Sequence, residues 1–345
     1  MPARMLLAAV ALLAASISCA AAHDLTIVSR GPGSIEPLRK VFVQPFVGAT
    51  NIAVRQEDRD DGIEALESRL KAPDNEWDLV ELRADELAAA CADGLLEKLD
   101  FSAIGGKDHY LPQGVSDCGV GATVSNIVLA WDRDKFSATP TWADFWDVAK
   151  YPGKRGLYRG PRGNLEIALI ADGVAAADVY RVLGTAEGVE RAFHKLDQLK
   201  PYLVWWQAGA EAERILSSGD VLMTSAPSDR ITVAARTGPR NFGMQWTASL
   251  SDVQSWAIIR SSPNLRQAIQ FLYFAGTAAI EGRLLDVAGA SGLAKNANDL
   301  LPPDLAAISP TNPANLGAAI RFDGGFWREN LAKLGQRFDA WLAQH

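Results

Sequence analysis

Cysteine, histidine and methionine are scarce in this chain, and their scarcity excludes several kinds of site. The 345 residues include 3 cysteines, 4 histidines and 4 methionines. No two cysteines have the C-x-x-C spacing of a redox motif, and no histidine has a partner at the spacing typical of metal ligands. We therefore expect no metal site and no cofactor.

Motifs for covalent catalysis and for nucleotide binding are missing as well. The chain has no G-x-S-x-G nucleophile elbow and no G-x-x-x-x-G-K-S/T phosphate loop. The Gly119-Val120-Gly121 segment lacks the third glycine of a dinucleotide-binding fingerprint. These absences favour a binding protein over an enzyme.

The chain also lacks an excess of positive charge. Its 34 lysines and arginines face 41 aspartates and glutamates, which gives a net charge of −7. An acidic balance argues against nucleic acid and against an anionic membrane surface as partners. After Ile17 no apolar run approaches the length that spans a bilayer, so we expect no transmembrane helix.

Residues 1–22 have the features of a signal peptide. Arg4 precedes an apolar run over residues 5–17, and three alanines at 20–22 supply a cleavage site before His23. We expect cleavage there and release of the mature chain into the periplasm. Cys19 leaves a lipoprotein anchor as an alternative, although Ser16 stands where such signals usually have an aliphatic residue.

Two cysteines, Cys91 and Cys118, remain after this cleavage. An even pair in an exported chain predicts a disulfide, because the compartment is oxidising. Two buried free thiols are the alternative.

Short apolar runs of strand length alternate with segments whose apolar residues recur at helical spacing. Such alternation predicts an α/β protein with a parallel or mixed sheet. Asp60 or Asp61 is expected to cap one helix, and Asp85 the next. The expected strands are 25–28, 52–54, 79–82, 156–158, 221–224 and 256–259, and the principal expected helices are 35–46, 63–70, 85–94, 189–199, 208–216, 265–272 and 327–341.

The segment from Thr141 to residue 173 has the most informative order of elements. Thr141 and Asp144 form a candidate capping box at a helix start, and Tyr151-Pro152-Gly153 ends that helix. A short strand then leads into the polar loop 159–163 and a second helix. Loops that leave strand ends in this way form the ligand sites of α/β proteins.

The same segment carries a family resemblance. The sequence WADFW (142–146) followed by YPGK (151–154) resembles periplasmic solute-binding proteins of ABC importers, and among them the spermidine/putrescine-binding branch. The likeness continues in order along nearly the whole mature chain, through VSRGPG, WDLVEL, ACADGLLEKLD, SDCGVGATV, KLDQLKP, WWQAGAE, SGDVLMTSA and PANLGAAIRFDGGFWREN.

This resemblance implies a type 2 periplasmic binding protein fold, with two α/β lobes, mixed central sheets and crossing hinge strands. Lobe 1 is expected at residues 23–130 plus 257–293, and lobe 2 at 131–256 plus 294–345. A small solute would bind in the cleft between them, and hinge closure around it is the expected motion. The expected partners are the solute and the ABC permease subunits, with the protein acting as a monomer.

The chain departs from the polyamine-binding pattern at the positions that the resemblance places in the cleft. Polyamine binders hold a flexible cation with aromatic rings and carboxylates. Here most of those rings are replaced, and several arginines stand in or beside their places. The residues that the resemblance assigns to the ligand are Arg30, Arg83, Asp85, Arg159, Arg162, Pro227, Arg230, Asp252, Gln254 and Ser291.

Arginine side chains at these positions indicate an anionic or zwitterionic organic solute. Arg30, Arg162 and Arg230 could converge on a carboxylate, phosphonate or sulfonate, since a guanidinium donates paired hydrogen bonds and stays charged. The alternatives are surface or salt-bridge roles for these arginines, and Asp229 could neutralise Arg230. A polyamine ligand and a transport-independent sensor role also remain open.

Overall fold

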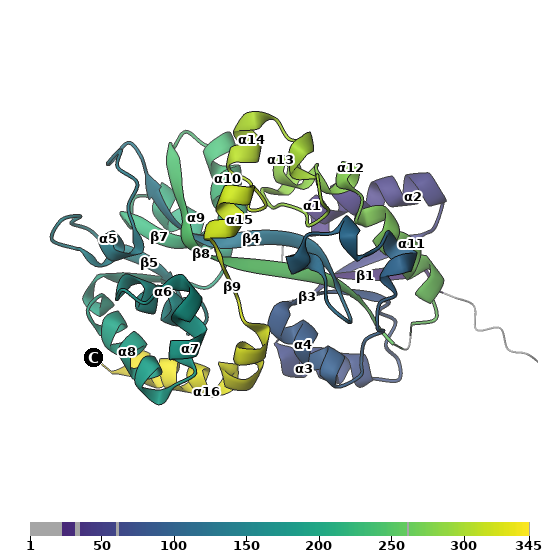
Figure 1. The fold of residues 1–345 in the computed structure, drawn as a ribbon, viewed down its shortest axis with the longest axis horizontal. Helices are drawn as coiled ribbons and strands as arrows, with labels where there is room; N and C mark the ends of the chain where they lie inside the picture. Colours follow the sequence, from purple (N-terminus) through teal and green to yellow (C-terminus); the bar gives the residue numbers. More distant parts are fainter. Residues whose placement is uncertain (1–22, 32–34, 60–61, 261, 345) are drawn as a thin grey trace, which may run out of the picture.

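One mixed sheet runs through the whole molecule. The computed structural model describes residues 23–31, 35–59, 62–260 and 262–344, so the expected signal peptide, with Cys19, lies outside the described residues. The strands follow the order β2-β1-β3-β8-β4-β7-β5-β6, and β9 pairs with β8. Helices pack around both ends of this sheet (Figure 1).

The first lobe is built on three parallel strands, β1 (Leu25–Arg30), β2 (Val54–Arg59) and β3 (Leu79–Arg83). Leu25 and Ile27 of β1 belong to a buried cluster with Phe46 and Phe271 from the covering helices. Those helices are α1 (Ile35–Leu38), α2 (Gln44–Thr50), α3 (Ile63–Lys71), α4 (Ala84–Ala92), α11 (Leu265–Ala275), α12 (Ala278–Glu281) and α13 (Leu284–Ala288).

The second lobe is built on β5 (Arg155–Tyr158), β6 (Leu203–Trp206) and β7 (Met223–Pro227), which are also parallel. Its core joins Leu157 and Leu165 to Trp327 and Trp341 of the C-terminal helix. The helices are α5 (Trp142–Trp146), α6 (Asn164–Ala171), α7 (Val179–Leu183), α8 (Ala186–Asp197), α9 (Gly209–Ser217), α10 (Ser228–Thr237) and α16 (Gly324–Ala343).

Two long antiparallel strands connect these halves. β4 (Val120–Asp132) and β8 (Phe242–Ile258) run across the middle of the molecule, between β3 and β7 (Figure 1). The short β9 (Ile320–Arg321) lies beside β8 and leads into α16, after α14 (Pro303–Ala307) and α15 (Pro313–Ala318). The sequence pattern predicted only the last part of β8 and did not predict β4.

The capping box expected at Thr141 is confirmed. The Thr141 backbone N–H donates to Asp144 over 2.9 Å, and the Asp144 N–H donates to the Thr141 hydroxyl over 3.2 Å. Arg155, fully buried, then holds the following turn by donating to the carbonyls of Phe145, Gly153 and Tyr151. The loop 159–163 therefore leaves a well-anchored strand.

Two expected helix starts differ from the structure. Asp85 does not cap α4, because Arg83 occupies the N-cap position. The Arg83 backbone N–H donates a hydrogen bond to the Glu86 carboxylate over 3.0 Å. Gly62 precedes α3 as its N-cap residue, while Asp60 and Asp61 lie outside the described residues. The helix expected over 35–46 continues to Thr50, with a π-helical segment over Arg39–Val43, and ends at a left-handed Asn51.

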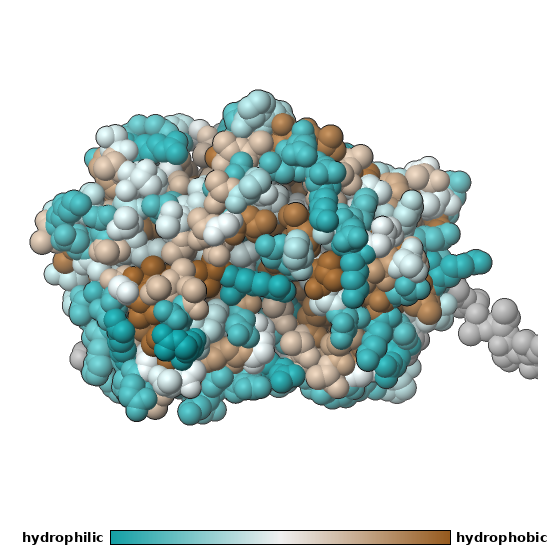
Figure 2. Space-filling model, viewed as in Figure 1, coloured by the Kyte–Doolittle hydropathy of each residue, from teal (hydrophilic) through white to brown (hydrophobic). Residues whose placement is uncertain are grey.

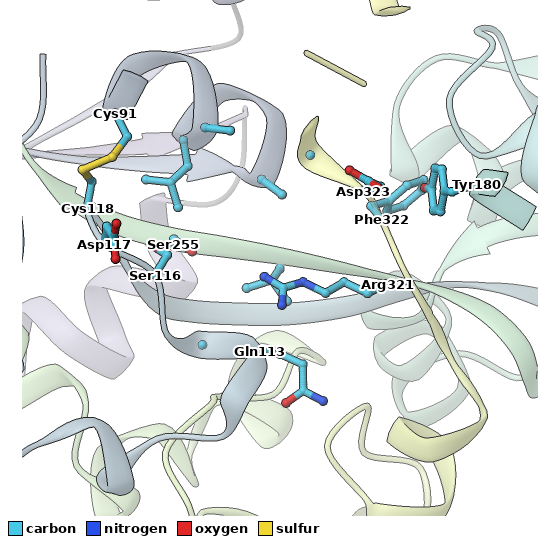
Figure 3. A pocket seen from close by; sticks show the side chains of 16 residues that line it. Cys91, Gln113, Ser116, Asp117, Cys118, Tyr180, Ser255, Arg321, Phe322 and Asp323 are labelled. Atoms are coloured by element: carbon cyan, nitrogen blue, oxygen red, sulfur yellow. A yellow bond between two sulfur atoms is a disulfide. The ribbon is translucent and has the colours of Figure 1, made fainter. Parts of the chain in front are cut away.

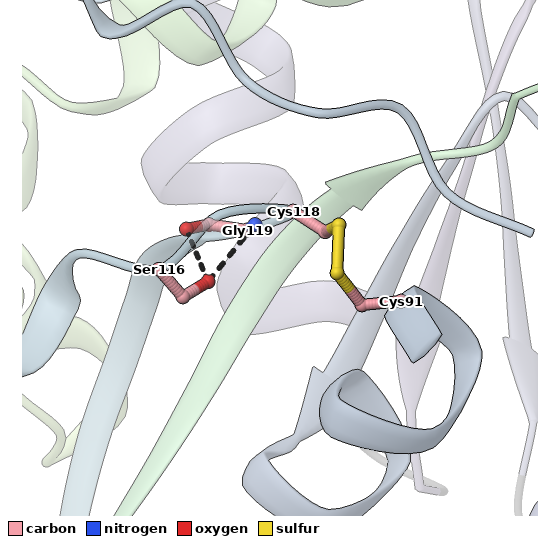
Figure 4. The surroundings of a disulfide bond; sticks show 4 residues. All are labelled: Cys91, Ser116, Cys118 and Gly119. Atoms are coloured by element: carbon pink, nitrogen blue, oxygen red, sulfur yellow. Dashed lines mark hydrogen bonds between the residues drawn. A yellow bond between two sulfur atoms is a disulfide. The ribbon is translucent and has the colours of Figure 1, made fainter. Parts of the chain in front are cut away.

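The expected disulfide between Cys91 and Cys118 is present. It joins α4 to the segment that precedes β4, where the Ser116 hydroxyl bonds the backbone of Gly119 (Figure 4). The bond thus fixes α4 against the start of a crossing strand. Within the described part of the chain, no helix combines the length and apolar character needed to cross a membrane.

Candidate ligand-binding site

Two adjoining cavities lie where strand ends from both lobes meet above β4 and β8. The larger, of about 660 Å³, is lined by Arg30, Arg83, Arg159 and Arg162 but only two carboxylates, Asp252 and Asp339; we call it the arginine cavity. The smaller, of about 460 Å³, is lined by Glu81, Asp229 and Asp252 with Arg30 and Arg230; we call it the carboxylate cavity. The two share Arg30, Ile127, Gln207, Ala208, Pro227 and Asp252.

The arginines of the first lobe are held by one buried carboxylate, that of Glu86. Arg30 ends β1 and Arg83 ends β3, so their parallel strands bring them to one edge of the sheet. Glu86 Oε2 lies 2.9 Å from Nη2 of Arg59, at the end of β2, and 3.5 Å from Nε of Arg30. Burial alone would raise the pKa of Glu86, but Arg83, Arg30 and Arg59 outweigh it and lower that pKa.

Asp85 lies behind Arg83 rather than in either cavity. Its carboxylate is buried and 3.4 Å from Arg83 Nη2. Burial, followed by the positive charges of Arg162 and Arg30, lowers the pKa of Arg83. The guanidinium groups of both lobes are therefore close enough to repel one another, and an added anion would relieve that repulsion.

Arg162 brings the second lobe to this cluster. It leaves the loop before α6, where Gly163 has a φ of +90°, and donates to Asp252 on β8 over 3.0 Å. Its guanidinium also stacks 3.8 Å from the ring centre of Phe322. Burial alone would raise the pKa of Asp252, but Arg162 outweighs it and lowers that pKa.

The floor of the carboxylate cavity is formed by the crossing strands. Thr123 of β4 lies opposite Gln254 of β8, and Ser125 lies opposite Asp252. Each of the two hydroxyls donates to a carboxylate. The Thr123 hydroxyl lies 3.5 Å from Oε1 of Glu81, and the Ser125 hydroxyl is hydrogen-bonded to Asp229. Glu81 comes from the first lobe and Asp229 from the second.

Both of these carboxylates are poorly solvated. Burial raises the pKa of Glu81 to about 7, even though its Oε2 accepts the Arg30 N–H over 3.0 Å. Burial also raises the pKa of Asp229, which forms an ion pair with Arg230 at 3.5 Å. A ligand cation between them would favour their charged forms.

Aromatic side chains close one side of the arginine cavity. The rings of Tyr158, at the end of β5, and Trp206, at the end of β6, are 5.2 Å apart between centroids. Phe322 and Phe338 also line this cavity. The apolar rings reduce hydration of the neighbouring guanidinium groups, which strengthens their attraction for an anion.

The structure brings most of the candidate residues together. Eight of the ten line one or both cavities: Arg30, Arg83, Arg159, Arg162, Pro227, Arg230, Asp252 and Gln254. Arg230 does not join Arg30 and Arg162 in the arginine cavity; it is exposed and paired with Asp229. Ser291 is buried elsewhere, bonded to Ser309 over 2.8 Å and to the backbone of Val124. The ligand-binding roles of all ten remain predictions.

Sequence reasoning missed Glu81, Glu86 and the hydroxyls of Thr123 and Ser125. Glu81 has a recognisable signal, because a charged residue inside the apolar strand 79–82 needs a buried partner or a ligand. Glu86 has a local signal only toward Arg83, three residues before it, because Arg30 and Arg59 come from strands far away in the sequence.

Comparison with known proteins assigns the chain to a family. The family model described as bacterial extracellular solute-binding protein matches residues 42–307. This chain belongs to that family. Its members bind solutes rather than transform them, and the protein is a solute-binding component of an ABC importer.

Relatives are similar over nearly their whole length. The gamma-aminobutyric acid (GABA)-binding protein of Pseudomonas aeruginosa is 37% identical over 331 residues, covering 96% of this chain and 94% of the relative. A solved GABA receptor is 29% identical with a TM-score of 0.84, covering 94% and 98%. MotA of A. tumefaciens B6, solved with glucopine, is 27% identical with a TM-score of 0.80, covering 93% and 100%.

These relatives confirm the two-lobe periplasmic-binding-protein fold and the expected solute-binding function. The family is extracellular and typically periplasmic. Solute-binding proteins of ABC importers deliver their small-molecule ligands to membrane permeases.

In the part of the chain that the structure describes, no three His, Cys, Asp or Glu residues form a group able to hold a metal ion.

Proposed function

We propose that the protein captures a small zwitterionic, amino-acid-like solute such as GABA and delivers it to an ABC permease. The division of charge between the two adjoining cavities supports this proposal. Four arginines and two carboxylates line one cavity, whereas three carboxylates and two arginines line the other, with Arg30 and Asp252 common to both. A solute with an anionic and a cationic end fits this polarity in one orientation.

In that orientation the solute carboxylate faces Arg30, Arg83 and Arg162. These three side chains are mostly buried, so little water surrounds their guanidinium groups. This favours short charge-assisted hydrogen bonds to the solute carboxylate. Two of them come from the first lobe and one from the second. A carboxylate bound by all three would therefore hold the lobes together.

The solute ammonium then faces Glu81 and Asp229 above the hydroxyls of Thr123 and Ser125. This pair also comes from opposite lobes, so both ends of the solute would favour the closed cleft. The relatives support the same class of ligand, because two of them are named for GABA and a third was solved with glucopine.

A polyamine fits less well. It would place a second ammonium in the arginine cavity, where one unit charge about 4 Å from a guanidinium costs about 4 kcal/mol at the effective dielectric constant of a protein surface. The carboxylates of Asp85, Glu86 and Asp252, which lie beside these guanidinium groups, are already paired with arginines.

We also propose where the protein acts, how its lobes are divided and which strands form the hinge. The mature chain begins at His23 in the periplasm and acts as a monomer. Lobe 1 comprises residues 23–130 and 257–293, lobe 2 comprises 131–256 and 294–345, and β4 and β8 act as the hinge.

Titration calorimetry on the ligand-stripped mature chain tests this proposal. GABA should bind, whereas butyrate and butylamine, which each carry one of its two charges, should bind at least about tenfold more weakly, equivalent to about 1.4 kcal/mol. Putrescine should not compete with GABA. Tight binding of putrescine without binding of GABA would restore the polyamine alternative and contradict the proposal.

A pair of variants separates a cleft effect from a loss of charge. Arg162→Ala should abolish GABA binding, while Arg240→Ala should leave it unchanged. Arg240 forms a similar 3.0 Å ion pair with Asp132, outside both cavities.

A further inference from the structure

A buried carboxylate that lines neither ligand cavity joins three elements of the second lobe. On the face shown in Figure 2, hydrophilic residues cover most of the rim of the molecule. Glu166 of α6 is acidic but completely buried, and burial raises the pKa of its carboxyl group. Taking a carboxylate out of water is costly unless hydrogen bonds replace the lost hydration, so the partners of Glu166 indicate what this side chain does.

Three hydrogen-bond donors surround this carboxylate. The Gly163 backbone N–H donates to Oε2 over 2.9 Å, while the Tyr180 hydroxyl and the Trp327 Nε1–H each donate to Oε1 over 2.8 Å. Tyr180 belongs to α7 and Trp327 to α16. The donors therefore come from the loop that carries Arg162 and from two helices.

These helix contacts are linked to the ring that stacks on Arg162. The Tyr180 oxygen is also hydrogen-bonded to the backbone of Asp323, which follows Phe322 and caps α16. Figure 3 shows Tyr180, Phe322 and Asp323 together at one side of a cavity of about 510 Å³. Because Phe322 lies against the Arg162 guanidinium, the partners of Glu166 also support the far end of this arginine.

The bond from Gly163 acts on the backbone at Arg162. The Gly163 nitrogen belongs to the peptide unit that follows Arg162, and this unit is planar, so the bond fixes the direction in which the chain leaves that residue. Gly163 has a φ of +90°, and a glycine offers the chain many other conformations. The hydrogen bond to Glu166 selects the one in which Arg162 reaches Asp252.

We propose that Glu166 is a positioning residue of the ligand site, which sets the Arg162 guanidinium for the solute carboxylate through the Gly163 N–H. This inference rests on the role of Arg162 in the proposed function. Glu166 does not touch the solute; it keeps the binding-competent direction of Arg162 populated before the solute arrives. Affinity falls in proportion to that population, so a loosened loop weakens binding even in a folded protein.

Two substitutions of Glu166 separate this role from support of the fold. At the same position of a capping box, an aspartate reaches the N-cap N–H, as Asp144 does for Thr141. Glu166→Asp should therefore keep the bond from Gly163 but release the two donors on the helices. Glu166→Gln should keep those two donors on its oxygen and turn its NH₂ group toward the Gly163 N–H, so that the bond from Gly163 is lost.

The two variants should differ in affinity, measured by titration calorimetry. Glu166→Gln should weaken the binding of GABA and of butyrate at least about fivefold, because an unsatisfied buried N–H disfavours the loop conformation. Butylamine, which has no carboxylate, should bind as it does to wild type. Glu166→Asp should bind GABA like wild type, although both variants should unfold at lower urea concentrations.

Glu281→Gln is the control for the loss of a buried carboxylate as such. Glu281 also accepts a backbone N–H, that of Ala294, and it lines neither ligand cavity. This variant should leave the affinity for GABA unchanged.

A measurement without ligand separates failure of this inference from failure of the proposed function. The ¹⁵N order parameter of the Arg162 Nε–Hε group, assigned as the signal missing from Arg162→Lys, should fall in Glu166→Gln toward that of the exposed Arg328. It should keep its wild-type value in Glu166→Asp. A wild-type value in folded Glu166→Gln, or an equal fall in both variants, would overturn the inference. If glutamine prevents folding, Glu166→Asp decides, because a mobile Arg162 there would overturn it.

Discussion

The carboxylate of Glu86 makes the most exacting prediction about stability. Glu86→Gln keeps the size of the side chain but removes the charge that faces Arg59, Arg30 and Arg83. The Glu86 side chain is 0% exposed and that of Arg59 is 2% exposed, so water has almost no access to this ion pair. Breaking a buried ion pair from one side costs about 3–5 kcal/mol.

We expect this loss in the free energy of unfolding at pH 7, measured by urea denaturation. The effect depends on pH with a defined sign. The folded-state pKa of Glu86 is lowered, so its contribution is complete above the unfolded-state value of about 4.3 and is lost as the pH falls through the folded-state value. The difference between wild type and Glu86→Gln should therefore shrink below about pH 4.

Glu329→Gln is the control for loss of an ion pair as such. Glu329 is exposed and pairs with Arg328 at 3.4 Å, an interaction worth about 0–1 kcal/mol. If Glu86→Gln costs no more than this control at pH 7, the buried carboxylate does not hold the strand-end arginines as described.

Three further predictions concern the cleft and the disulfide. Arg162→Lys should weaken GABA binding at least about tenfold by calorimetry, because an ammonium cannot replace paired guanidinium hydrogen bonds; equal affinity would exclude a direct role. The affinity for GABA should rise between pH 6 and 8, because a bound ammonium favours the ionised form of Glu81, whose pKa burial raises to about 7. Glu81→Gln should remove this pH dependence. If the variant keeps the pH dependence, a group other than Glu81 takes up the proton. Replacing both cysteines by alanine should lower the free energy of unfolding by about 3–4 kcal/mol for a loop of this length; an unchanged urea midpoint would contradict it.

The sequence pattern was sufficient where local rules decide the structure. The alternation of strands and helices, the capping box at Thr141 and the turn at Tyr151 all follow from neighbouring residues. Arg30 and Arg83 are assigned to the ligand by the family resemblance and not by the pattern. In the structure each ends a parallel strand, and such strand ends share one edge of a sheet.

The pattern failed where distant segments meet. β4 has one glycine, Gly121, and the polar residues Thr123, Ser125 and Asn126 in its first half, so only the apolar run over residues 127–131 indicates a strand. Arg230 resembles the other arginines in sequence, but its place on α10 turns it toward Asp229. Ser291 was assigned by position alone, and the structure places it in a hydroxyl cluster with Ser309 and Thr311.

The most direct test of the central claim is a crystal structure of the mature chain with GABA. The account predicts one orientation, with the GABA carboxylate bound by Arg30, Arg83 and Arg162 and its ammonium between Glu81 and Asp229. The opposite orientation, or a ligand bound outside both cavities, would contradict the charge division on which the proposed function rests.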